Sequence, residues 1–235
     1  MVCAMQNYDI TQFKNPLFTV DSVLFTVVEN TLKVLMVKRA NDPYARRWGL
    51  PGGFVDVDKD DDTDMTARRK LAEKTGLSPR YLEQLQVFSG INRDPRGFSV
   101  TSAYSALVAH QSVETHIETV AQAKWISLNE LSSLPVAFDH KHIIDIAHKR
   151  LQQKALYSMV PVYCCPEQFT VGQLKNVIET IIEKSIQRKS LMRRIESSDM
   201  FELVDEKVHS GGRSAQLYKT KKDVSMTHFE RNLSV

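Results

Sequence analysis

The pattern of hydrophobic and polar residues changes along the chain, and this change divides it into two regions. Between Phe18 and about Leu107, runs of β-branched and aromatic residues such as Val20–Val28 and Leu32–Lys38 are separated by turns, which is typical of strands. Thr63–Thr75 contains neither proline nor glycine and stops at Gly76, which predicts a helix closed by a C-terminal glycine.

The same alternation continues toward the middle of the chain. Phe98–Val108 and Ala123–Ile126 predict strands, and Leu128–Leu134 predicts a turn of helix. Asp139 can cap a longer helix whose apolar residues recur at helical spacing, namely Ile143, Ile144, Ala147 and Leu151. This mixture indicates an α+β domain over residues 1–156.

Residues 157–168 contain two prolines and predict a linker to a second region. Thr170-Val-Gly-Gln173 then has the form of a capping box before an amphipathic helix. A second helix can begin near Gln187, and two strand-like runs follow at Phe201–Val208 and Ser214–Thr220. Helix, turn, basic helix and hairpin is the order of a winged helix-turn-helix, which we assign to residues 169–222, with a tail at 223–235.

Composition restricts the class of protein. Charged residues make up 25% and apolar residues 42%, which is typical of a globular protein, and no apolar run reaches the roughly 20 residues of a membrane helix. Met1–Ile10 lacks a signal-peptide pattern, so we expect a cytoplasmic protein without membrane contacts. Cys164 and Cys165 are adjacent and Cys3 lies in the N-terminal tail, so the cysteines predict neither a disulfide nor a metal site.

Positive charge is concentrated in the second region. The whole chain carries only +3, whereas Lys184–Lys222 contains ten lysines and arginines against five acidic residues. In the second helix of this region Lys189, Ser190, Arg193 and Arg194 are expected on one face. This pattern favours DNA binding, and the alternative is a dimerisation or protein-docking domain whose basic face is merely solvated.

A motif in the first region carries a more specific signal. Arg46-Arg-Trp-Gly-Leu-Pro-Gly-Gly-Phe-Val55 precedes a helix that ends Arg69-Lys-Leu-Ala-Glu-Lys-Thr-Gly-Leu77. This resembles the Nudix hydrolase signature, and the matching positions are Arg69, Leu71, Glu73, Gly76 and Leu77. The resemblance implies an α/β/α sandwich in a family that cleaves nucleoside diphosphates with a divalent metal held by glutamates of this helix. We expect Arg69 to pair with a nearby acidic residue.

The chain departs from that signature at the metal ligands. Lys70 and Lys74 replace two glutamates, and Asp61, at the position of the first glutamate, is farther from Gly53 than the signature requires. Lys70, Glu73 and Lys74 share one helix face, so we expect no bound metal and no catalytic residue there. The two lysines and Glu73 can instead line a diphosphate site, and the alternative is that both lysines are solvated at its rim.

A loop after this helix adds two arginines. Asn92-Arg-Asp-Pro-Arg-Gly97 precedes the strand that contains Tyr104, and Arg93 and Arg96 can contact phosphate or ribose, although an ordinary polar hairpin explains the loop equally well. The phrase resembles ADP-ribose-directed members of the Nudix superfamily, which implies ADP-ribose as the ligand. The same resemblance places further residues near it, namely Arg46, Arg47, Trp48, Gly52, Gly53, Phe54 and Tyr104.

Ala137-Phe-Asp-His140 also resembles that subgroup. Phe138 as a packing residue and Asp139 as a helix cap explain this element adequately. His140 receives little weight as a general base, because such a base needs a demonstrated partner.

Both regions together resemble the Nudix-related transcriptional regulators of NAD metabolism, the NrtR type, over about Phe18–Thr220. The resemblance implies a homodimeric repressor of NAD biosynthesis or salvage genes that binds a palindromic DNA operator. ADP-ribose or a related NAD-derived nucleotide is its implied effector, and no cofactor is required. The candidates for base edges are Gln187, Arg188, Lys189 and Ser190, and those for phosphates or the minor groove are Thr170, Arg193, Arg194 and the wing residue Arg213.

Two alternative functions stay open at this point. The first is a Mg²⁺-dependent ADP-ribose pyrophosphatase that uses Asp61, Glu73 and the neighbouring aspartates as ligands, and release of AMP would identify it. The second is a ligand-gated protein-interaction module, which would not bind an operator-like duplex at moderate salt.

Overall fold

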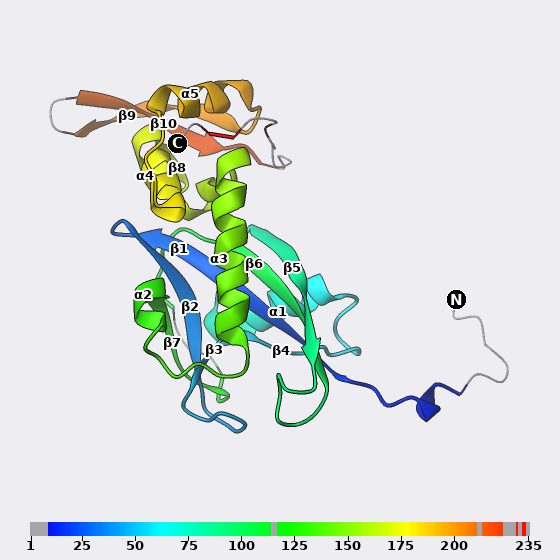
Figure 1. The fold of residues 1–235 in the computed structure, drawn as a ribbon. Coiled ribbons are helices and arrows are strands. Elements are labelled where there is room, and N and C mark those ends of the chain that lie inside the picture. Colours follow the sequence, from blue (N-terminus) through cyan, green and yellow to red (C-terminus); the bar gives the residue numbers. More distant parts are fainter. Residues whose placement is uncertain (1–8, 114–116, 211–212, 223–228, 230–231, 234–235) are drawn as a thin grey trace.

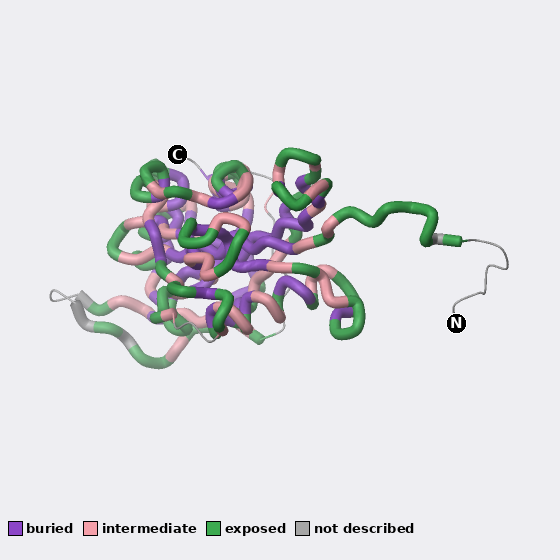
Figure 2. The backbone as a smooth tube through the Cα atoms, turned by 90° about the horizontal axis from the view of Figure 1, so that it is seen from below, coloured by how far each residue is buried: buried purple, intermediate pink, exposed green. Residues whose placement is uncertain are grey.

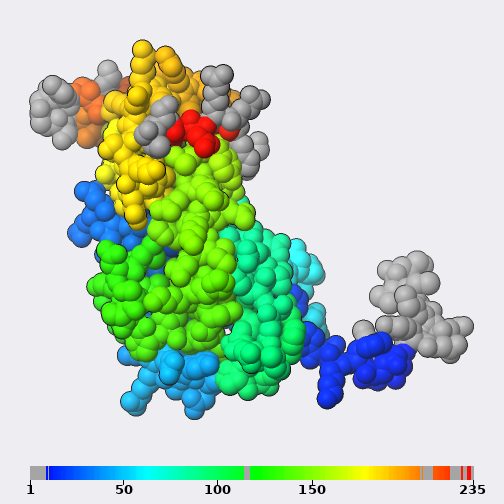
Figure 3. Space-filling model, in the orientation of Figure 1, coloured from blue at the N-terminus to red at the C-terminus, as the bar shows by residue number. Residues whose placement is uncertain are grey.

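The chain is described by a computed structural model, which covers residues 9–113, 117–210, 213–222, 229 and 232–233. A large sheet domain forms one end of the molecule and a smaller helix-and-hairpin domain forms the other, and helix α3 runs from the first to the second (Figure 1). The N-terminal segment, which includes the short 3-10 helix η1 (Ile10–Gln12), projects away from the body (Figure 3). No helix in the described part of the chain is long and apolar enough to cross a membrane.

The large domain contains a mixed seven-stranded sheet. Its central path is β3-β2-β1-β6-β5, with β4 paired to β1 and β7 paired to β2. Strands β1 and β6 run parallel, and the other pairings are antiparallel. The strands are β1 (Leu17–Val28), β2 (Thr31–Arg39), β3 (Trp48–Gly49), β4 (Gly52–Phe54), β5 (Tyr81–Gly90), β6 (Ser99–Leu107) and β7 (Val120–Ser127).

Helices cover both faces of this sheet because its central strands are apolar on both sides. Along β1, Val23 and Phe25 join the core cluster beneath α3 (His140–Tyr157), whereas Leu24 joins a separate cluster with Leu71 of α1 (Thr63–Thr75). Successive side chains of a strand point to opposite faces, so an uninterrupted apolar run requires a helix on each face. The short helix α2 (Leu128–Leu131) follows β7. The predicted α/β/α sandwich is confirmed.

Helix α1 has the predicted bounds, and local chemistry fixes both of its ends. The Asp62 side chain accepts a hydrogen bond from the Met65 amide at 2.7 Å, and Gly76 closes the helix in a left-handed conformation with φ 70°. The expected cap of α3 is wrong, because the Asp139 side chain makes no capping hydrogen bond and instead pairs with Arg93.

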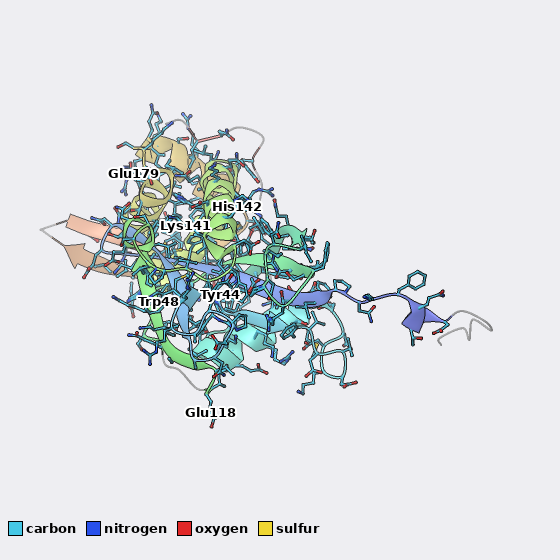
Figure 4. The ribbon with its side chains drawn as sticks, turned by 60° about the horizontal axis from the view of Figure 1, so that its bottom comes forward. Tyr44, Trp48, Glu118, Lys141, His142 and Glu179 are labelled. Atoms are coloured by element: carbon cyan, nitrogen blue, oxygen red, sulfur yellow. The ribbon has the colours of Figure 1, made fainter. Side chains whose placement is uncertain are left out.

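The smaller domain has the order of elements expected for a winged helix. Its elements are β8 (Gln168–Thr170), α4 (Val171–Ile182), α5 (Arg188–Ser197), β9 (Phe201–Ser210) and β10 (Arg213–Thr220). The capping box predicted at Thr170 and Gln173 is confirmed. The turn between α4 and α5 is fixed by the Glu179 carboxylate, which accepts a hydrogen bond from the Ile186 amide at 2.8 Å (Glu179 is labelled in Figure 4).

The segment expected as a linker is a packed connection. It contains the 3-10 helix η2 (Val160–Cys164), and the side chains of Val160, Pro161, Val162 and Cys164 are buried. Val160, Val162 and Cys164 belong to one continuous core cluster that includes Leu151 of α3 and Leu174 of α4. Seen from below, buried residues gather in the interior of the molecule and exposed residues lie toward its rim (Figure 2). Pro161 lies in this buried turn and Pro166 is exposed after it, and composition alone does not distinguish such a turn from an exposed linker.

Two further contacts join the domains. Asn176 of α4 donates a hydrogen bond to Asn30, in the β1–β2 turn, at 2.7 Å. Near the C-terminus, the Phe229 and Leu233 amides donate to the Tyr157 and Leu156 carbonyls at the end of α3, at 2.7 and 2.8 Å.

Candidate ligand site and DNA-binding surface

A cavity of about 430 Å³ opens in the sheet domain between β1, α1 and the start of α3. Its lining combines backbone of the β3–β4 region with charged side chains from five elements and loops. The lining residues are Thr19, Asp21, Arg39, Asn41, Asp42, Leu50, Gly52, Gly53, Phe54, Lys70, Glu73, Lys74, Arg93, Asp94, Arg96, Ile117, Thr119, Phe138 and His140.

The two glycines of the Pro-Gly-Gly phrase let the chain pass close to β1 and α1. A Cβ at Gly52 would lie 2.2 Å from the Val20 carbonyl oxygen, so only glycine fits this close approach. Gly53 has φ 157°, and a Cβ there would lie 3.3 Å from Cε of Lys70. The phrase therefore forms one wall of the cavity and brings that wall against the lysine-bearing face of α1.

Most of the charged groups in the lining are paired. Arg93 forms a bidentate pair with Asp139, with distances of 3.0 Å from Nε and 2.9 Å from Nη2. Arg96 pairs with Asp94 at 2.7 Å, and Lys70 pairs with Glu73 at 3.2 Å. Arg39 donates a hydrogen bond to the Pro43 carbonyl at 2.8 Å. With Arg93, Arg96 and Lys70, four of the five cations that line the cavity are therefore held by contacts within the protein.

Lys74 is the exception. Within the described residues no hydrogen bond or ion pair is made by its ammonium group, although it lines the cavity. Burial, with a further contribution from the neighbouring cations Lys70 and Arg39, lowers the pKa of Lys74 to about 8, and Asp21 and Glu73 oppose that shift. An anion entering the cavity would satisfy this group.

The Nudix-like helix is held by an ion pair between Arg69 and Asp60, the residue before the Asp61 that stands at the position of the first glutamate of the signature. Asp60, not Asp61, accepts two hydrogen bonds from Arg69, at 2.7 and 2.5 Å, and Asp61 is exposed. The expected structural role of Arg69 is confirmed, and its guanidinium holds the pKa of Asp60 well below the usual range. The longer loop after Gly53 forms a turn in which the Lys59 and Asp60 amides both donate to the Asp56 carbonyl, and this turn brings Asp60 toward α1.

A divalent cation does not fit these residues. Glu73 accepts hydrogen bonds from Arg69 at 2.9 Å and from Lys70 at 3.2 Å. Although burial opposes the change, these bonds lower the pKa of Glu73, so the carboxylate is committed to cations of the protein. The part of the chain that the structure describes contains no group of three or more histidine, cysteine, aspartate or glutamate residues arranged to hold a metal.

A buried polar network forms part of the cavity wall. Asp21 accepts a hydrogen bond from the Thr101 hydroxyl at 2.8 Å, and its carboxylate lies 3.4 Å from Nε2 of His140. Nδ1 of His140 accepts from the Leu50 amide at 2.9 Å, so the imidazole connects α3 to β1 and to the turn after β3. Both ring nitrogens of His140 therefore lie next to polar groups of the protein.

The surface expected to contact DNA lies on α5. Leu191 and Ile195 are buried on the inner face of this helix, whereas Gln187, Arg188 and Lys189 at its N-terminal end are exposed. Arg193 is also exposed, and no ion pair within residues 9–113, 117–210 and 213–222 engages Arg188, Lys189 or Arg193. The basic face is therefore available to phosphates and base edges.

Comparisons with known proteins agree with both sites. Residues 19–145 match the NUDIX domain and residues 161–220 match the NrtR DNA-binding winged helix domain. The chain is 36% identical over 215 residues to the ADPR responsive transcriptional repressor NtrR of Acinetobacter baylyi, covering 92% of this chain and 86% of that protein.

Solved structures give the same result. The Shewanella oneidensis NrtR structure complexed with a 27mer DNA is 45% identical, covers 93% of this chain and 100% of its own, and superposes with a TM-score of 0.86. The NUDIX domain of the same protein complexed with ADP ribose is 47% identical, covers 62% of this chain and 94% of its own, and gives a TM-score of 0.60.

The chain belongs to the NrtR family.

In this NrtR-family chain, the cavity brings together eight of the residues expected at the ligand, from three separate motifs. They are Gly52, Gly53, Phe54, Lys70, Glu73, Lys74, Arg93 and Arg96. The motifs converge because β4 pairs with β1, α1 packs on β1, and the loop that carries the two arginines ends where β6 begins beside β1.

Four expected ligand residues do not line the cavity of this NrtR-family chain. Trp48 is buried, with the Lys38 ammonium 5.8 Å from its ring centroid, and Tyr104 is hydrogen-bonded to Thr63 at 2.7 Å. Arg46 is exposed, and the Arg47 guanidinium lies 5.1 Å from the ring of Tyr44 (Tyr44 and Trp48 are labelled in Figure 4). Trp48 and Tyr104 are buried and pack as core residues.

Two expected DNA-contact residues have other surroundings. Arg194 is only 6% exposed, and its guanidinium lies 4.6 Å from the ring of Phe229, so its expected place on the phosphate-contacting face is wrong. Burial lowers the pKa of Arg194. The Thr170 hydroxyl accepts from the Gln173 amide as a helix cap, and the side chain of Arg213 lies outside the described residues.

Sequence reasoning missed several lining residues, chiefly Asp21, Arg39, Asp94 and Phe138. Asp21 interrupts the apolar run of β1, and a lone acidic residue in a buried strand is a signal that pattern reading could have used. Phe138 has φ 53° and Tyr44 has φ 64°, and such strained backbone, which clusters at functional sites, has no signature in the sequence.

Proposed function

We propose that this chain is a transcriptional repressor of NAD biosynthesis or salvage genes whose operator affinity is controlled by ADP-ribose or a related NAD-derived nucleotide. The observation that carries the proposal is the unpaired, half-buried Lys74 ammonium, which stands at the position of a metal ligand of the Nudix signature, in a cavity connected by α3 to a winged helix. The relatives with known ligands include a repressor described as ADPR responsive and NrtR structures with DNA and with ADP ribose.

The cavity fits a nucleotide of this kind in size and charge. Its volume of about 430 Å³ falls within the range of roughly 300–1,000 Å³ that is typical of small-molecule sites. Lys74 supplies a cation that no carboxylate neutralises directly, and Lys70 lies one helical turn away on the same face. In the proposed complex the diphosphate lies against these lysines, and Arg93 and Arg96 contact the phosphates or ribose.

The same residues argue against hydrolysis as the main activity. Cleavage by a Nudix enzyme requires carboxylates that hold a metal, and Glu73 is already bonded to Arg69 and Lys70. The double substitution Lys70→Glu and Lys74→Glu should weaken ADP-ribose binding strongly. Unchanged affinity without any dependence on Mg²⁺ would contradict the role given to the lysines.

DNA binding is assigned to α5 with support from the wing. In the proposed complex Gln187, Arg188, Lys189 and Ser190 contact base edges in the major groove, and Arg193 and the wing residue Arg213 contact phosphates or the minor groove. The functional division that we propose is 1–156 for ligand binding, 157–168 for the connection, 169–222 for DNA and 223–235 for the tail.

A homodimer is proposed because one winged helix covers only half of a palindromic operator. Two aromatic residues give a second copy an apolar surface, since Phe18 and Phe98 are 41% and 51% exposed. They lie on neighbouring strands, because the Phe98 carbonyl accepts from the Leu17 amide where β6 begins beside β1. Substitution of Phe18 and Phe98 by serine should produce monomers in light scattering and weaken operator binding.

The deciding experiment is a fluorescence-anisotropy titration of the protein with duplexes from the region upstream of its own gene, with and without ADP-ribose. The same samples are assayed for AMP. Specific binding that weakens with intact ADP-ribose is the expected result. Production of AMP without sequence-specific DNA binding would identify a divergent pyrophosphatase, and a protein that binds ADP-ribose but no duplex would be an interaction module.

A further inference from the structure

The N-terminal end of α3 lies at the cavity, and its cap position is occupied by an acidic residue that does not cap it. Asp139 has φ −93° and ψ 15°, outside the extended conformation usual for a capping residue, and its side chain accepts no hydrogen bond from the helix amides. The first amides of an α-helix have no partner within the helix, so this end is left without its usual cap.

The Asp139 carboxylate is held by the cavity instead. It accepts two hydrogen bonds from Arg93, whose side chain is only 8% exposed and also donates to the Ser99 hydroxyl at 3.1 Å. The residue before it, Phe138, has φ 53°, which is a strained conformation for a residue with a side chain. In this arrangement Asp139 pairs with Arg93, while Phe138 keeps a strained backbone and α3 lacks a side-chain cap.

A bound diphosphate competes for that arginine. Arg93 and Phe138 both line the cavity, and a phosphate offers a guanidinium the same bidentate geometry as a carboxylate. Once phosphate oxygens replace it, the Asp139 carboxylate would be left beside an anion. The amides of Lys141 and His142, which belong to the first turn and have no partner within the helix, lie next to it in the chain (both residues are labelled in Figure 4). Rotation toward these amides relieves both the repulsion and the missing cap.

Helix α3 can transmit such a change to the DNA-binding domain. It has 18 residues, which corresponds to about 27 Å, and its far end packs against α4 and η2 (Figure 1). The Tyr157 and Leu156 carbonyls at that end hold Phe229 and Leu233, and the Phe229 ring lies against Arg194 of α5. A change at the start of α3 therefore reaches the recognition helix through contacts that are all present in this structure.

We propose that Asp139 is a ligand-displaced latch, which pairs with Arg93 in the DNA-binding state and caps α3 when a nucleotide diphosphate takes Arg93. This inference rests on the proposed function and adds to it the residue that couples the cavity to the operator. Asp139 acts as a positioning residue: it competes with the ligand and sets the start of α3.

Two substitutions separate the two roles of Asp139. Asp139→Ser can cap α3 but cannot pair with Arg93, so it should imitate the ligand-bound state and bind operator weakly even without ADP-ribose. Asp139→Ala can do neither, so it should keep the operator affinity of the ligand-free protein and lose most of its response to ADP-ribose. Both should bind ADP-ribose more tightly than the unmodified protein, because the competing carboxylate is gone.

The measurements are calorimetric titration with ADP-ribose and anisotropy titration with operator duplex, together with melting curves for every variant. The matched control is Asp145→Asn, which removes an exposed acidic residue from the same helix without touching Arg93. Its response to ADP-ribose should equal that of the unmodified protein, in the usual range of about 5–150-fold.

Serine and alanine variants that respond like the unmodified protein would overturn the latch, as would ADP-ribose affinities that are unchanged or lower in both folded variants. A different result overturns the proposed function: unmodified protein that binds ADP-ribose with no change in operator affinity. In that case tighter ADP-ribose binding by both Asp139 variants would still establish the competition, and equal binding would exclude it.

Discussion

Helices α1 and α5 each place two cations four residues apart on one face, Lys70 with Lys74 and Lys189 with Arg193. On α1 these side chains face a cavity, where Lys70 is 21% exposed and burial lowers the pKa of Lys74. On α5 the equivalent side chains are exposed to solvent above a buried Leu191 and Ile195.

The difference shows that helical spacing of basic residues does not define their chemistry. A partly buried ammonium next to other cations favours binding of an anion, because an unpaired charge away from water is energetically costly. An exposed row of cations binds a long polyanion through many weak, salt-sensitive contacts. One sequence pattern thus gives this protein a small-molecule site at one end and a nucleic-acid surface at the other.

The largest expected effect is on the exposed helix. Arg188→Ala with Lys189→Ala should weaken specific operator binding by about 1–3 kcal/mol for each lost base contact, while ADP-ribose affinity stays unchanged. Arg193→Ala should reduce the slope of log affinity against log salt by about one unit. Anisotropy titrations at several salt concentrations measure both, with Arg80→Ala, an exposed arginine of the other domain, as control. Operator affinity that survives the double substitution would move the recognition surface elsewhere.

Substitution of Lys74 should change the affinity for ADP-ribose and leave operator binding unchanged. Lys74→Met keeps the length and apolar contacts of the side chain, and it should weaken ADP-ribose binding by about 1.5–3 kcal/mol, the usual value of a hydrogen bond to a charged group. Calorimetric titration measures this, and Lys59→Met is the matched control because Lys59 is 65% exposed and pairs with Asp56 outside the cavity. Equal losses in both variants would mean that general charge, and not the position of Lys74, attracts the ligand.

The pH dependence of ligand binding sharpens the comparison. Since the pKa of Lys74 is lowered to about 8, the ammonium is charged at pH 7 and becomes neutral as pH rises through that value. ADP-ribose affinity should therefore fall between pH 7 and 9, by up to about tenfold for each unit above the pKa, and binding above pH 8 should take up a proton. Lys74→Arg, which stays charged, should bind with a flat profile. A parallel fall in that variant would assign the effect to another group.

The smallest expected effect concerns the one arginine of α5 that is buried. Arg194→Met should lower stability by about 0.5–2 kcal/mol through loss of the cation–π contact with Phe229, without changing the salt dependence of operator binding. Thermal melting and the same salt series measure the two quantities. A reduced salt slope with unchanged melting temperature would return Arg194 to the phosphate-contacting surface.

The sequence by itself determined those elements whose ends are fixed by neighbouring residues, together with the resemblance to a family. The bounds of α1, the capping box at Thr170 and the start of α5 near Gln187 depend on neighbouring residues only, so local patterns sufficed. The sequence also showed that Lys70 and Lys74 stand where the Nudix signature has glutamates and that they share one face of α1, because residues four apart lie on the same side of a helix.

Tertiary structure decided everything that depends on which groups meet. The partner of Arg69 is Asp60 because the longer loop folds back, Asp139 pairs with Arg93 across a separation of 46 residues, and the guanidinium of the buried Arg194 lies against the ring of Phe229. A motif gives the order of residues along the chain, whereas pairing, burial and pKa depend on distances in space. Those distances are set by the parallel pairing of β1 with β6 and by the packing of α3 against both domains.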